Sequence, residues 1–464
     1  YLCVGILQGL SGPLFNVYPL YLGATEAQQT TIMSLRSLPA SLKIVFGFWS
    51  DTVPLWGYRR KAYMCIGWLL SSFSMMVLSR WSNLQRLNDE TPPEDAPSIA
   101  FLSTIVLLFG TGFWLADVMG DSLVAEKAKL EGPSQKGQLQ STCYACRFFG
   151  VMVCSPIATL LLNNNRNGIV VVVNLLLWTP LVLCLIPIYY LGEARNAVVR
   201  PVRDQLQEIW NTVGSRAVWQ PMGFVYLYNL LQIPNAAWKE FLKSVLLFED
   251  WQLNTLLVIA NVLVYVGVMA YKYYFIKYSW RTIYIGTTVL NSVLSLGQVL
   301  LITNLIPFGL SPFVFALGDD IIVDFVAGIQ FLPTTIMMVH LCPSGSEGAS
   351  YAMFTTVSNC AFGLAGAAST ILTNIWDVRK DTMVGGDTSG ILKLSLFTTA
   401  LQTSGLLFVR LLPRTKDDLA ALHHNDQHSA WGGGIFLTIT LCSVGYAIVV
   451  SGLNVLAPGW AGES

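Results

Sequence analysis

The stretch GFWLADVMGDSLVAEKAKLEGPSQKGQLQSTCYACRFFG, residues 112–150, decides how the rest of the chain is interpreted. It places Asp117 and Asp121 four residues apart in one apolar run, passes through a short Lys-containing loop, and returns into an apolar run that carries Arg147. Residues four apart on a helix lie on one face. Charged side chains inside a membrane are costly and usually have a partner or a function. The stretch therefore predicts a helical hairpin in a solute pathway.

The composition is that of an integral membrane protein surrounded by a lipid bilayer. Of 464 residues, 53% are hydrophobic and 12% are charged, whereas soluble proteins are roughly 25% charged. Lys plus Arg and Asp plus Glu both number 27, so the net charge gives no argument for a nucleic-acid partner. The chain starts at Tyr1 instead of Met, and we expect a preceding segment with a targeting signal. The choice between a plasma membrane and an organelle membrane (plastid or mitochondrion) stays open.

Apolar runs of about 20 residues, the length that crosses a bilayer, predict twelve spans. They are 1–22, 28–50, 62–80, 99–122, 139–162, 168–191, 221–247, 251–271, 280–304, 317–341, 347–375 and 391–411. A run from Trp431 to Ala457 predicts a thirteenth, C-terminal span, with an interfacial helix as the alternative because Gly432–Gly434 open it. Such a helix could attach the chain to a partner in a membrane complex.

The distribution of Lys and Arg predicts which loops face the cytoplasm. Sixteen of these residues fall in one set of loops and five in the opposite set. The predicted domains are therefore an N-terminal six-helix bundle (1–191), a cytoplasmic linker (192–220), a C-terminal six-helix bundle (221–412), and a cytoplasmic loop with the extra helix (413–464).

A charged loop motif gives the first specific resemblance. Gly47, Asp51, Gly57, Arg59 and Arg60 resemble the loop motif between helices two and three of the major facilitator superfamily. The resemblance implies that the acid and the basic pair brace a cytoplasmic gate. A charged turn that only sets topology is the alternative.

The chain further resembles the folate-biopterin transporter family of that superfamily. The matching stretches are 38–43, 49–51 with 57–61, 117–126, 139–141 with Arg147, 234–238, 279–281, 330–333 and 342–352. The resemblance implies an all-α major facilitator fold of two six-helix bundles and a proton-driven transporter of folate, biopterin or a similar solute. S-adenosylmethionine or another organic solute is the alternative substrate within the family.

Depth counting at ~1.5 Å per residue brings four charges to one level of the first bundle. Asp117 and Arg147 each lie about 12 Å inside the predicted cytoplasmic edge, and Lys43 reaches nearly that depth. Asp121 lies one turn away on the face of Asp117. These four residues predict a proton-coupling element or gate, with Asp117 as the first choice of proton carrier. A static network that only locks the helices is the alternative.

The remaining candidates are substrate-binding and gate residues. Lys239 and Asp324, each about 11 Å from the outer edge, predict a pair near the outer mouth. Arg36 has no acid at its own level in its bundle and is expected to bind an anionic group of the substrate.

Trp114 and Trp238 are candidates to stack on a flat pterin ring, although large aromatic residues in membranes often only pack. Glu126, at a predicted helix end, is expected to latch onto Arg59 or Arg60.

Other classes of protein are disfavoured. His340, His423, His424 and His428 show no metal-ligand pattern, and the sequence predicts neither a metal nor a cofactor. We find no P-loop, HExxH or GxSxG motif in a catalytic context, so the chain is not expected to be an enzyme. A transporter fold retained as a receptor or as a structural subunit stays open. Against it stands the intramembrane charge, which a purely structural protein has no need to keep.

Overall fold

The computed structural model describes residues 1–464 except 25, 82–96, 132–136, 165, 194, 196–200, 307–308, 344–345, 374, 425–426 and 457–464. Every element of this described part is a helix, apart from two isolated bridges between single residues, so the all-α prediction is confirmed. The chain divides into two compact units. Unit 1 comprises Tyr1–Thr212, Met338–Thr356 and Thr438–Ser464, and unit 2 comprises Val213–Met337 and Val357–Leu437.

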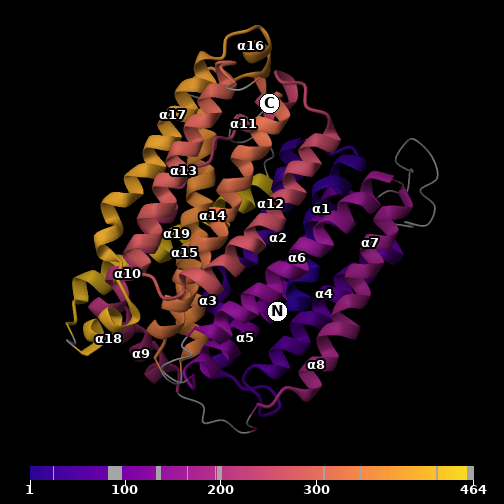
Figure 1. Ribbon diagram of the computed structural model, residues 1–464. Helices are drawn as coiled ribbons and strands as arrows, with labels where there is room; N and C mark the ends of the chain where they lie inside the picture. Colours follow the sequence, from indigo (N-terminus) through magenta and orange to yellow (C-terminus); the bar gives the residue numbers. More distant parts are fainter. Residues whose placement is uncertain are drawn as a thin grey trace. The chain divides into compact units, whose positions relative to one another are not determined.

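Unit 1 contains the helices of the first half of the chain, coloured indigo to magenta in Figure 1. They are α1 (Leu2–Tyr21), α2 (Glu26–Ser41), α3 (Lys43–Thr52), α4 (Lys61–Trp81), α5 (Ile99–Ala128), α6 (Gln138–Asn164), α7 (Arg166–Thr179), the π-helical turn η2 (Pro180–Cys184), α8 (Leu185–Tyr190) and most of α9 (Val202–Gly214). The unit also includes the last turn of α14 (Pro312–Leu341), the first turns of α15 (Glu347–Thr373) and much of α19 (Ala430–Leu456). The predicted hairpin corresponds to α5 and α6, and its tip at 132–136 lies outside the described residues.

Unit 2 contains most of the helices of the second half. They are α10 (Arg216–Leu231), α11 (Trp238–Ser244), α12 (Asp250–Ala270), the π-helical turn η3 (Tyr271–Phe275), α13 (Trp280–Ile302), the greater part of α14 and α15, α16 (Lys380–Val384), α17 (Ser389–Ser404), the 3-10 helix η5 (Gly405–Leu411), α18 (Lys416–His424) and the start of α19. Figure 1 shows α13 packed along α17.

Nine helical segments among the described residues are long and apolar enough to cross a membrane. They lie at 61–80, 99–128, 138–162, 167–190, 255–275, 280–302, 312–341, 389–411 and 430–450. The last segment lies in α19, so the length and composition of this helix fit the predicted thirteenth span. Helices α1 and α15 are outside this set. The count of thirteen spanning helices stays a prediction.

Two predicted spans are broken in the structure. The span predicted at 28–50 is divided at Leu42, three residues after Pro39, whose ring cannot donate a backbone hydrogen bond. Lys43 therefore opens α3. The span predicted at 221–247 begins earlier, at Arg216, and is interrupted at residues 232–237, around Pro234, before the short helix α11.

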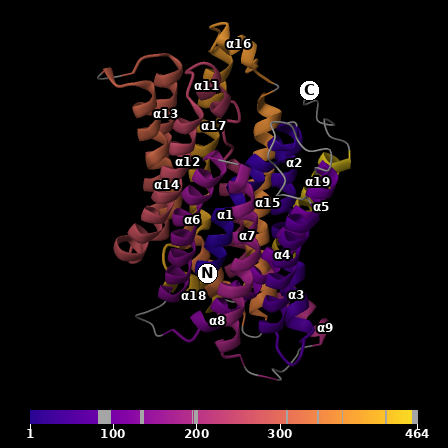
Figure 2. The same ribbon diagram turned by 90° about the vertical axis from the view of Figure 1, so that its right-hand side faces the viewer.

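Close helix crossings hold unit 1 together. A Cβ atom added to Gly5 would lie 2.0 Å from the carbonyl oxygen of Arg147, so α1 and α6 meet backbone to backbone. A Cβ atom on Gly112 would lie 2.5 Å from the carbonyl oxygen of Gly67, which brings α4 equally close to α5. Figure 2 shows these helices from the side. Because glycine lacks a side chain, the polar residues of α5 and α6 are brought near those of α1.

Candidate functional site

Four buried charges meet inside unit 1, and we call them the charge cluster: Lys43, Asp117, Asp121 and Arg147. Lys43 Nζ lies 2.8 Å from Asp117 Oδ2 and 3.5 Å from Asp121 Oδ2. Arg147 Nη1 lies 2.9 Å from Asp117 Oδ1. All four residues are at most 8% exposed. The structure therefore brings together the four residues that depth counting placed at one level.

The two acids of the charge cluster have different partners. Asp117 has a cation on each carboxylate oxygen. Among the described residues, the one cation at ion-pair distance from Asp121 is Lys43, through the longer contact, and Asp121 Oδ1 accepts hydrogen bonds from the Tyr1 hydroxyl at 2.5 Å and the Tyr144 hydroxyl at 3.4 Å. The two carboxylates are therefore not equivalent, although the sequence places them on one helical face.

The first turns of α15 reach the charge cluster through hydroxyl groups. The Tyr144 and Tyr351 hydroxyls lie 3.1 Å apart, and Gln140 Nε2 donates to the Tyr351 hydroxyl at 2.9 Å. Residues 338–356 belong to unit 1, so all these contacts are internal to that unit. A continuous buried chain of polar groups therefore joins Asp121 on α5 to Tyr351 on α15.

A second group of charges, which we call the gate cluster, comprises Asp51, Arg59, Arg60 and Glu126. Asp51 accepts from Arg59 Nη2 at 2.8 Å and from Arg60 Nη2, while Glu126 Oε1 lies 3.0 Å from Arg60 Nη2 and 3.8 Å from Arg59 Nη2. Burial by itself lowers the pKa of Arg60, but the neighbouring carboxylates of Asp51 and Glu126 raise this pKa above its ordinary value. The predicted contact of Glu126 with the basic pair is present.

The gate cluster holds the N-terminus of α15. The other carboxylate oxygen of Asp51 accepts from the backbone N–H of Ala349 at 2.7 Å. Lys129 Nζ lies 2.8 Å from Glu347 Oε1. A Cβ atom on Gly348 would lie 2.6 Å from Arg60 Nη1, so a larger residue here would require the guanidinium to shift. An acid next to the free N–H groups of a helix start is favourable.

Glu193 caps the opposite end of the loop motif. Its carboxylate accepts backbone N–H bonds from Arg59, Arg60 and Lys61 at 2.8 to 2.9 Å. These groups begin α4, so Glu193 satisfies donors that the helix itself leaves unpaired. Sequence reasoning did not select Glu193, because it lies more than 130 residues away along the chain.

Arg36 and Trp114 lie next to each other in unit 1. Arg36 Nη1 donates to the Ser11 hydroxyl at 3.2 Å, and the Trp114 ring nitrogen donates to the backbone oxygen of Arg36 at 3.0 Å. Lys43 Nζ lies 4.6 Å from the Trp114 ring centroid. No carboxylate within the described residues lies at ion-pair distance from Arg36. The Trp114 ring thus has the Lys43 ammonium beside it, and its N–H is bonded to the backbone of the residue that carries the guanidinium.

The predicted outer pair is wrong. Lys239, which is exposed, and Asp324, which is half-buried, form no ion pair with each other within the part of the chain that the structure describes. Depth counting failed here because α11 ends at Ser244, so a count inward from Leu247 starts outside the helix and the helical rise per residue does not apply to it. Trp238 stacks on Phe241, with ring centroids 5.7 Å apart, and packs in an apolar core.

Unit 2 instead contains a neutral polar network around Gln330, which sequence reasoning did not select as a site. Gln330 Nε2 donates to the Tyr228 hydroxyl at 3.0 Å and to Thr287 Oγ1 at 2.8 Å. The Tyr228 hydroxyl also lies 2.6 Å from Thr288 Oγ1, and the Tyr284 hydroxyl donates to the Gln330 backbone oxygen at 3.0 Å. These side chains offer amide and hydroxyl groups without net charge.

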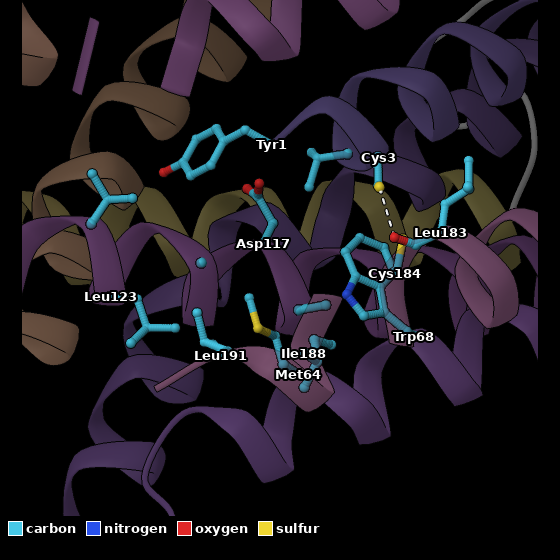
Figure 3. Close-up of a pocket in the computed structure, with 14 residues that line it drawn as sticks. Tyr1, Cys3, Met64, Trp68, Asp117, Leu123, Leu183, Cys184, Ile188 and Leu191 are labelled. Carbon is cyan, nitrogen blue, oxygen red and sulfur yellow. Dashed lines mark hydrogen bonds between the residues drawn. The ribbon is translucent and has the colours of Figure 1, made fainter. Parts of the chain in front are cut away.

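An apolar cavity of about 250 Å³ lies beside the charge cluster in unit 1 (Figure 3). Asp117 reaches it from α5, Tyr1 and Cys3 from the start of α1, and Trp68 from α4. Cys3 Sγ donates to the backbone oxygen of Leu183 at 3.1 Å. Because most of the lining is apolar, Asp117 keeps its two cations instead of being solvated.

Comparisons with known proteins identify relatives of this chain. A family model described as BT1 family matches residues 16–428. A folate-biopterin transporter of Synechocystis sp. is 27% identical over 394 residues, covering 84% of this chain and 76% of the relative. Folate transporter 1 of Plasmodium falciparum is 22% identical over 380 residues, covering 80% of this chain and 71% of the relative.

Two solved structures show the fold. The proton:xylose symporter XylE, of the major facilitator superfamily, superposes with a TM-score of 0.61 at 14% identity, covering 91% of this chain and 99% of that chain. The major facilitator protein FucP superposes with a TM-score of 0.62 at 11% identity, covering 89% and 97%. The all-helical chain thus has the major facilitator fold, as the sequence predicted.

Proposed function

Because this chain belongs to the BT1 family, we propose that it is a secondary active transporter that moves folate- or pterin-type solutes across a membrane by alternating access. Relatives named as folate and folate-biopterin transporters support this substrate class. The single observation that carries the proposal is the buried charge cluster, whose four residues are at most 8% exposed in a chain of the transporter fold. A protein that served only as scaffold has no need for such costly charges.

The gate cluster is proposed to be the inner gate. Asp51 accepts a hydrogen bond from Ala349, and Arg60 packs closely against Gly348. Both contacts are made to the start of one helix, so they can break together when α15 moves away. The Lys129–Glu347 ion pair adds a charged contact at the same place. In this arrangement the carboxylate of Asp51 attracts the N-terminus of α15, and this attraction keeps the gate closed.

The proposed substrate contacts in unit 1 are Arg36 and Trp114. An arginine side chain binds a carboxylate through two parallel N–H bonds, and an indole ring stacks on a flat heterocycle. Ser11 is a neutral partner that a substrate anion can replace without separating an ion pair. The glutamate tail of a folate would supply the anion and its pterin ring the flat surface.

Unit 2 is proposed to recognise the pterin ring through uncharged side chains. The amide and hydroxyl groups around Gln330 match the donors and acceptors on the edge of a pterin ring. Lys239, Asp324 and Trp238 are not retained as substrate residues. The proposed domain division remains two six-helix bundles, 1–191 and 221–412, joined by the linker 192–220.

Uptake into liposomes tests the substrate class. The purified chain is reconstituted and supplied with labelled folate, biopterin or S-adenosylmethionine, with and without a pH gradient. Folate and biopterin accumulation supports the proposal, and acceleration by a proton gradient supports proton coupling. Uptake of S-adenosylmethionine alone would assign a different organic solute, and no flux of any of the three would favour a receptor or structural subunit.

Arg36→Gln tests the recognition of the anion. Folate carries carboxylates and biopterin carries none, so loss of the guanidinium is expected to weaken folate uptake about tenfold or more and biopterin uptake much less, since a charged hydrogen bond contributes about 1.5–3 kcal/mol. The matched control is Arg379→Gln, at an exposed loop arginine whose side chain is 84% accessible. Equal losses for both solutes would refute the role of Arg36.

A further inference from the structure

The buried chain from Asp121 to Gln140 contains one polar atom that no described residue satisfies. Gln140 is fully buried, and its Nε2 donates to the Tyr351 hydroxyl, but its carbonyl Oε1 has no hydrogen-bond partner among the described residues. A buried acceptor without a partner is costly and requires an explanation. Gln140 therefore has an unused acceptor directly beside the Tyr351 hydroxyl. This hydroxyl needs a new acceptor if the bond between Tyr144 and Tyr351 reverses its direction.

The direction of the chain follows from counting hydrogens. Each tyrosine hydroxyl has one hydrogen to donate. When Asp121 is ionised it only accepts, so Tyr144 donates to Asp121, Tyr351 donates to Tyr144, and Gln140 donates to Tyr351. In this state all the donors point toward the carboxylate, and Gln140 Oε1 is left over.

Protonation of Asp121 reverses the chain. A proton on Oδ1 makes the acid a donor toward Tyr144 while the Tyr1 hydroxyl still donates to the same oxygen, so Tyr144 donates to Tyr351 and Tyr351 needs a new acceptor. A half-turn of the Gln140 amide brings Oε1 to the place where Nε2 now lies, 2.9 Å from the Tyr351 hydroxyl. The atom that is unsatisfied in the first state is then the acceptor of the second state.

Asp121 is the acid better suited to take the proton. Protonation of Asp117 would disrupt ion pairs at 2.8 and 2.9 Å, whereas protonation of Asp121 disrupts one contact at 3.5 Å. The ionisable groups among the described residues that face Asp121 are Lys43 from α3, Asp117 from α5, Cys143, Tyr144 and Arg147 from α6, Tyr1 from the start of α1, and Tyr351 from α15 at the end of the hydroxyl chain. Asp117 stays paired with both cations in either state, so the charge cluster does not fall apart when the proton binds.

We propose that Asp121 is the proton-binding site and that Tyr144, Tyr351 and Gln140 are positioning residues that transmit its protonation to the first turns of α15. This inference rests on the proposed alternating-access function. It replaces Asp117, the carrier that the sequence favoured, by its neighbour one turn away. The chain ends on Tyr351, two residues from Ala349, whose N–H is held by Asp51. A change at Asp121 therefore acts on the helix start that the gate cluster binds.

The first turns of α15 contain groups that an open gate would hydrate. The hydroxyls of Ser346, Ser350 and Thr356 are buried without a hydrogen-bond partner among the described residues. Water reaches such hydroxyls when the helix moves away, which offsets the loss of the gate contacts. The closed gate is therefore held by the few contacts between the gate cluster and the start of α15. Weakening one of these contacts shifts the equilibrium toward the open gate.

The direction of the shift follows from hydrogen-bond strength. A hydroxyl that donates to a carboxylate makes a stronger bond than one between neutral groups. Because hydrogen bonds in a chain polarise one another, Tyr144 is a better acceptor for the Tyr351 hydroxyl when it donates to ionised Asp121. Ionised Asp121 thus strengthens the Tyr144–Tyr351 contact and favours the closed gate, and protonation of Asp121 weakens this contact. We expect the open fraction of the 347–356 segment to rise roughly fivefold on protonation, because the difference between charged and neutral hydrogen bonds is about 1 kcal/mol.

Hydrogen–deuterium exchange of peptides spanning 347–356 tests the switch without a substrate. The full chain in liposomes is measured from pH 5 to 8, with correction for the chemical exchange rate. In the natural sequence, exchange of this segment should rise as the pH falls. Tyr144→Phe and Tyr351→Phe keep the rings but remove the hydroxyls, so the dependence on pH should be lost. Asp121→Asn should show the high exchange at every pH.

Controls separate the switch from folding and from transport. Tyr63→Phe removes a buried hydroxyl that donates to the Val53 backbone oxygen at 2.7 Å, and it should keep the natural pH dependence. If Tyr351→Phe does not fold, Tyr144→Phe and Gln140→Met provide the same test. Unchanged pH dependence in the hydroxyl variants or in Asp121→Asn would overturn the proposal.

Solute exchange at equal pH, measured on the same liposomes, reports the proposed function independently. Solute exchange without a pH response of 347–356 means that the switch is wrong while the transporter proposal stands. If the pH response depends on the hydroxyls but no solute flux is seen, the switch stands and the transporter proposal is wrong.

Discussion

Removing the charge of Asp117 is the most direct test of whether the balance of two acids and two bases stabilises the charge cluster. Asp117→Asn leaves two cations, Lys43 and Arg147, facing the single acid Asp121 at sites that are 8% exposed or less. Breaking a buried ion pair by removing one partner costs about 3–5 kcal/mol, because the other charge stays buried without compensation. We take the lower end, about 3 kcal/mol, because Asp121 is still near Lys43.

Thermal unfolding of the purified protein in detergent measures this effect. A loss of about 3 kcal/mol corresponds to a fall of roughly 6–12 °C in Tm for a unit of about 250 residues. The double variant Asp117→Asn with Lys43→Met restores one cation to one acid, Arg147 with Asp121, and should recover at least half of the loss. The control Asp377→Asn affects an exposed ion pair with Arg379, with the side chains 44% and 84% accessible, and should leave Tm unchanged.

Two results would refute the reasoning. A fall in Tm of less than about 2 °C in Asp117→Asn would mean that the cluster tolerates net charge, for example through water that enters the cavity. A double variant that is less stable than the single one would mean that Lys43 stabilises the unit through packing or through the Trp114 ring. Either outcome would mean that charge balance is not what stabilises the cluster.

Other predictions concern single contacts. Gly5→Val should prevent α1 from meeting α6, because a Cβ atom there lies 2.0 Å from the Arg147 carbonyl oxygen, and size-exclusion chromatography should show loss of the folded monodisperse protein. Glu193→Gln should weaken the start of α4 by about 1 kcal/mol, seen as faster amide exchange at Arg59–Lys61, with no change at α13. Gln330→Leu should lower the affinity for biopterin several-fold while the exchange of 347–356 stays unchanged, because its partners Tyr228 and Thr287 belong to unit 2.

Sequence reasoning worked best for continuous helices. Asp117, Asp121 and Arg147 lie on long helices, so a constant rise per residue gave their relative depth correctly. The same counting failed for Lys239, because the count ran inward from Leu247 although α11 ends at Ser244. It succeeded for Lys43 although the helix breaks at Leu42, since the count ran from Ser50 within α3 and did not cross the break.

The residues that the sequence did not select share one property: they act through partners far away in the chain. Tyr351 meets Gln140, 211 residues earlier, and Glu347 meets Lys129, 218 residues earlier. Their types gave little signal, since a tyrosine or glutamine in a membrane helix commonly only packs. Both Gln140 and Tyr351 lie in stretches that resemble the folate-biopterin transporter family, and those stretches were the only available indication.

By itself the sequence determined the class of protein, because hydropathy and charge act locally: apolar runs of span length, rare charges and a charged loop motif require a helical membrane protein. Only the tertiary structure decided the chemistry of the hairpin at 112–150. It distinguished Asp117, held by two cations, from Asp121, held mainly by hydroxyls, and it joined Asp121 to α15. The strength of a buried charge depends on distances of 3 to 4 Å to groups from several helices, and no pattern along one helix specifies those distances.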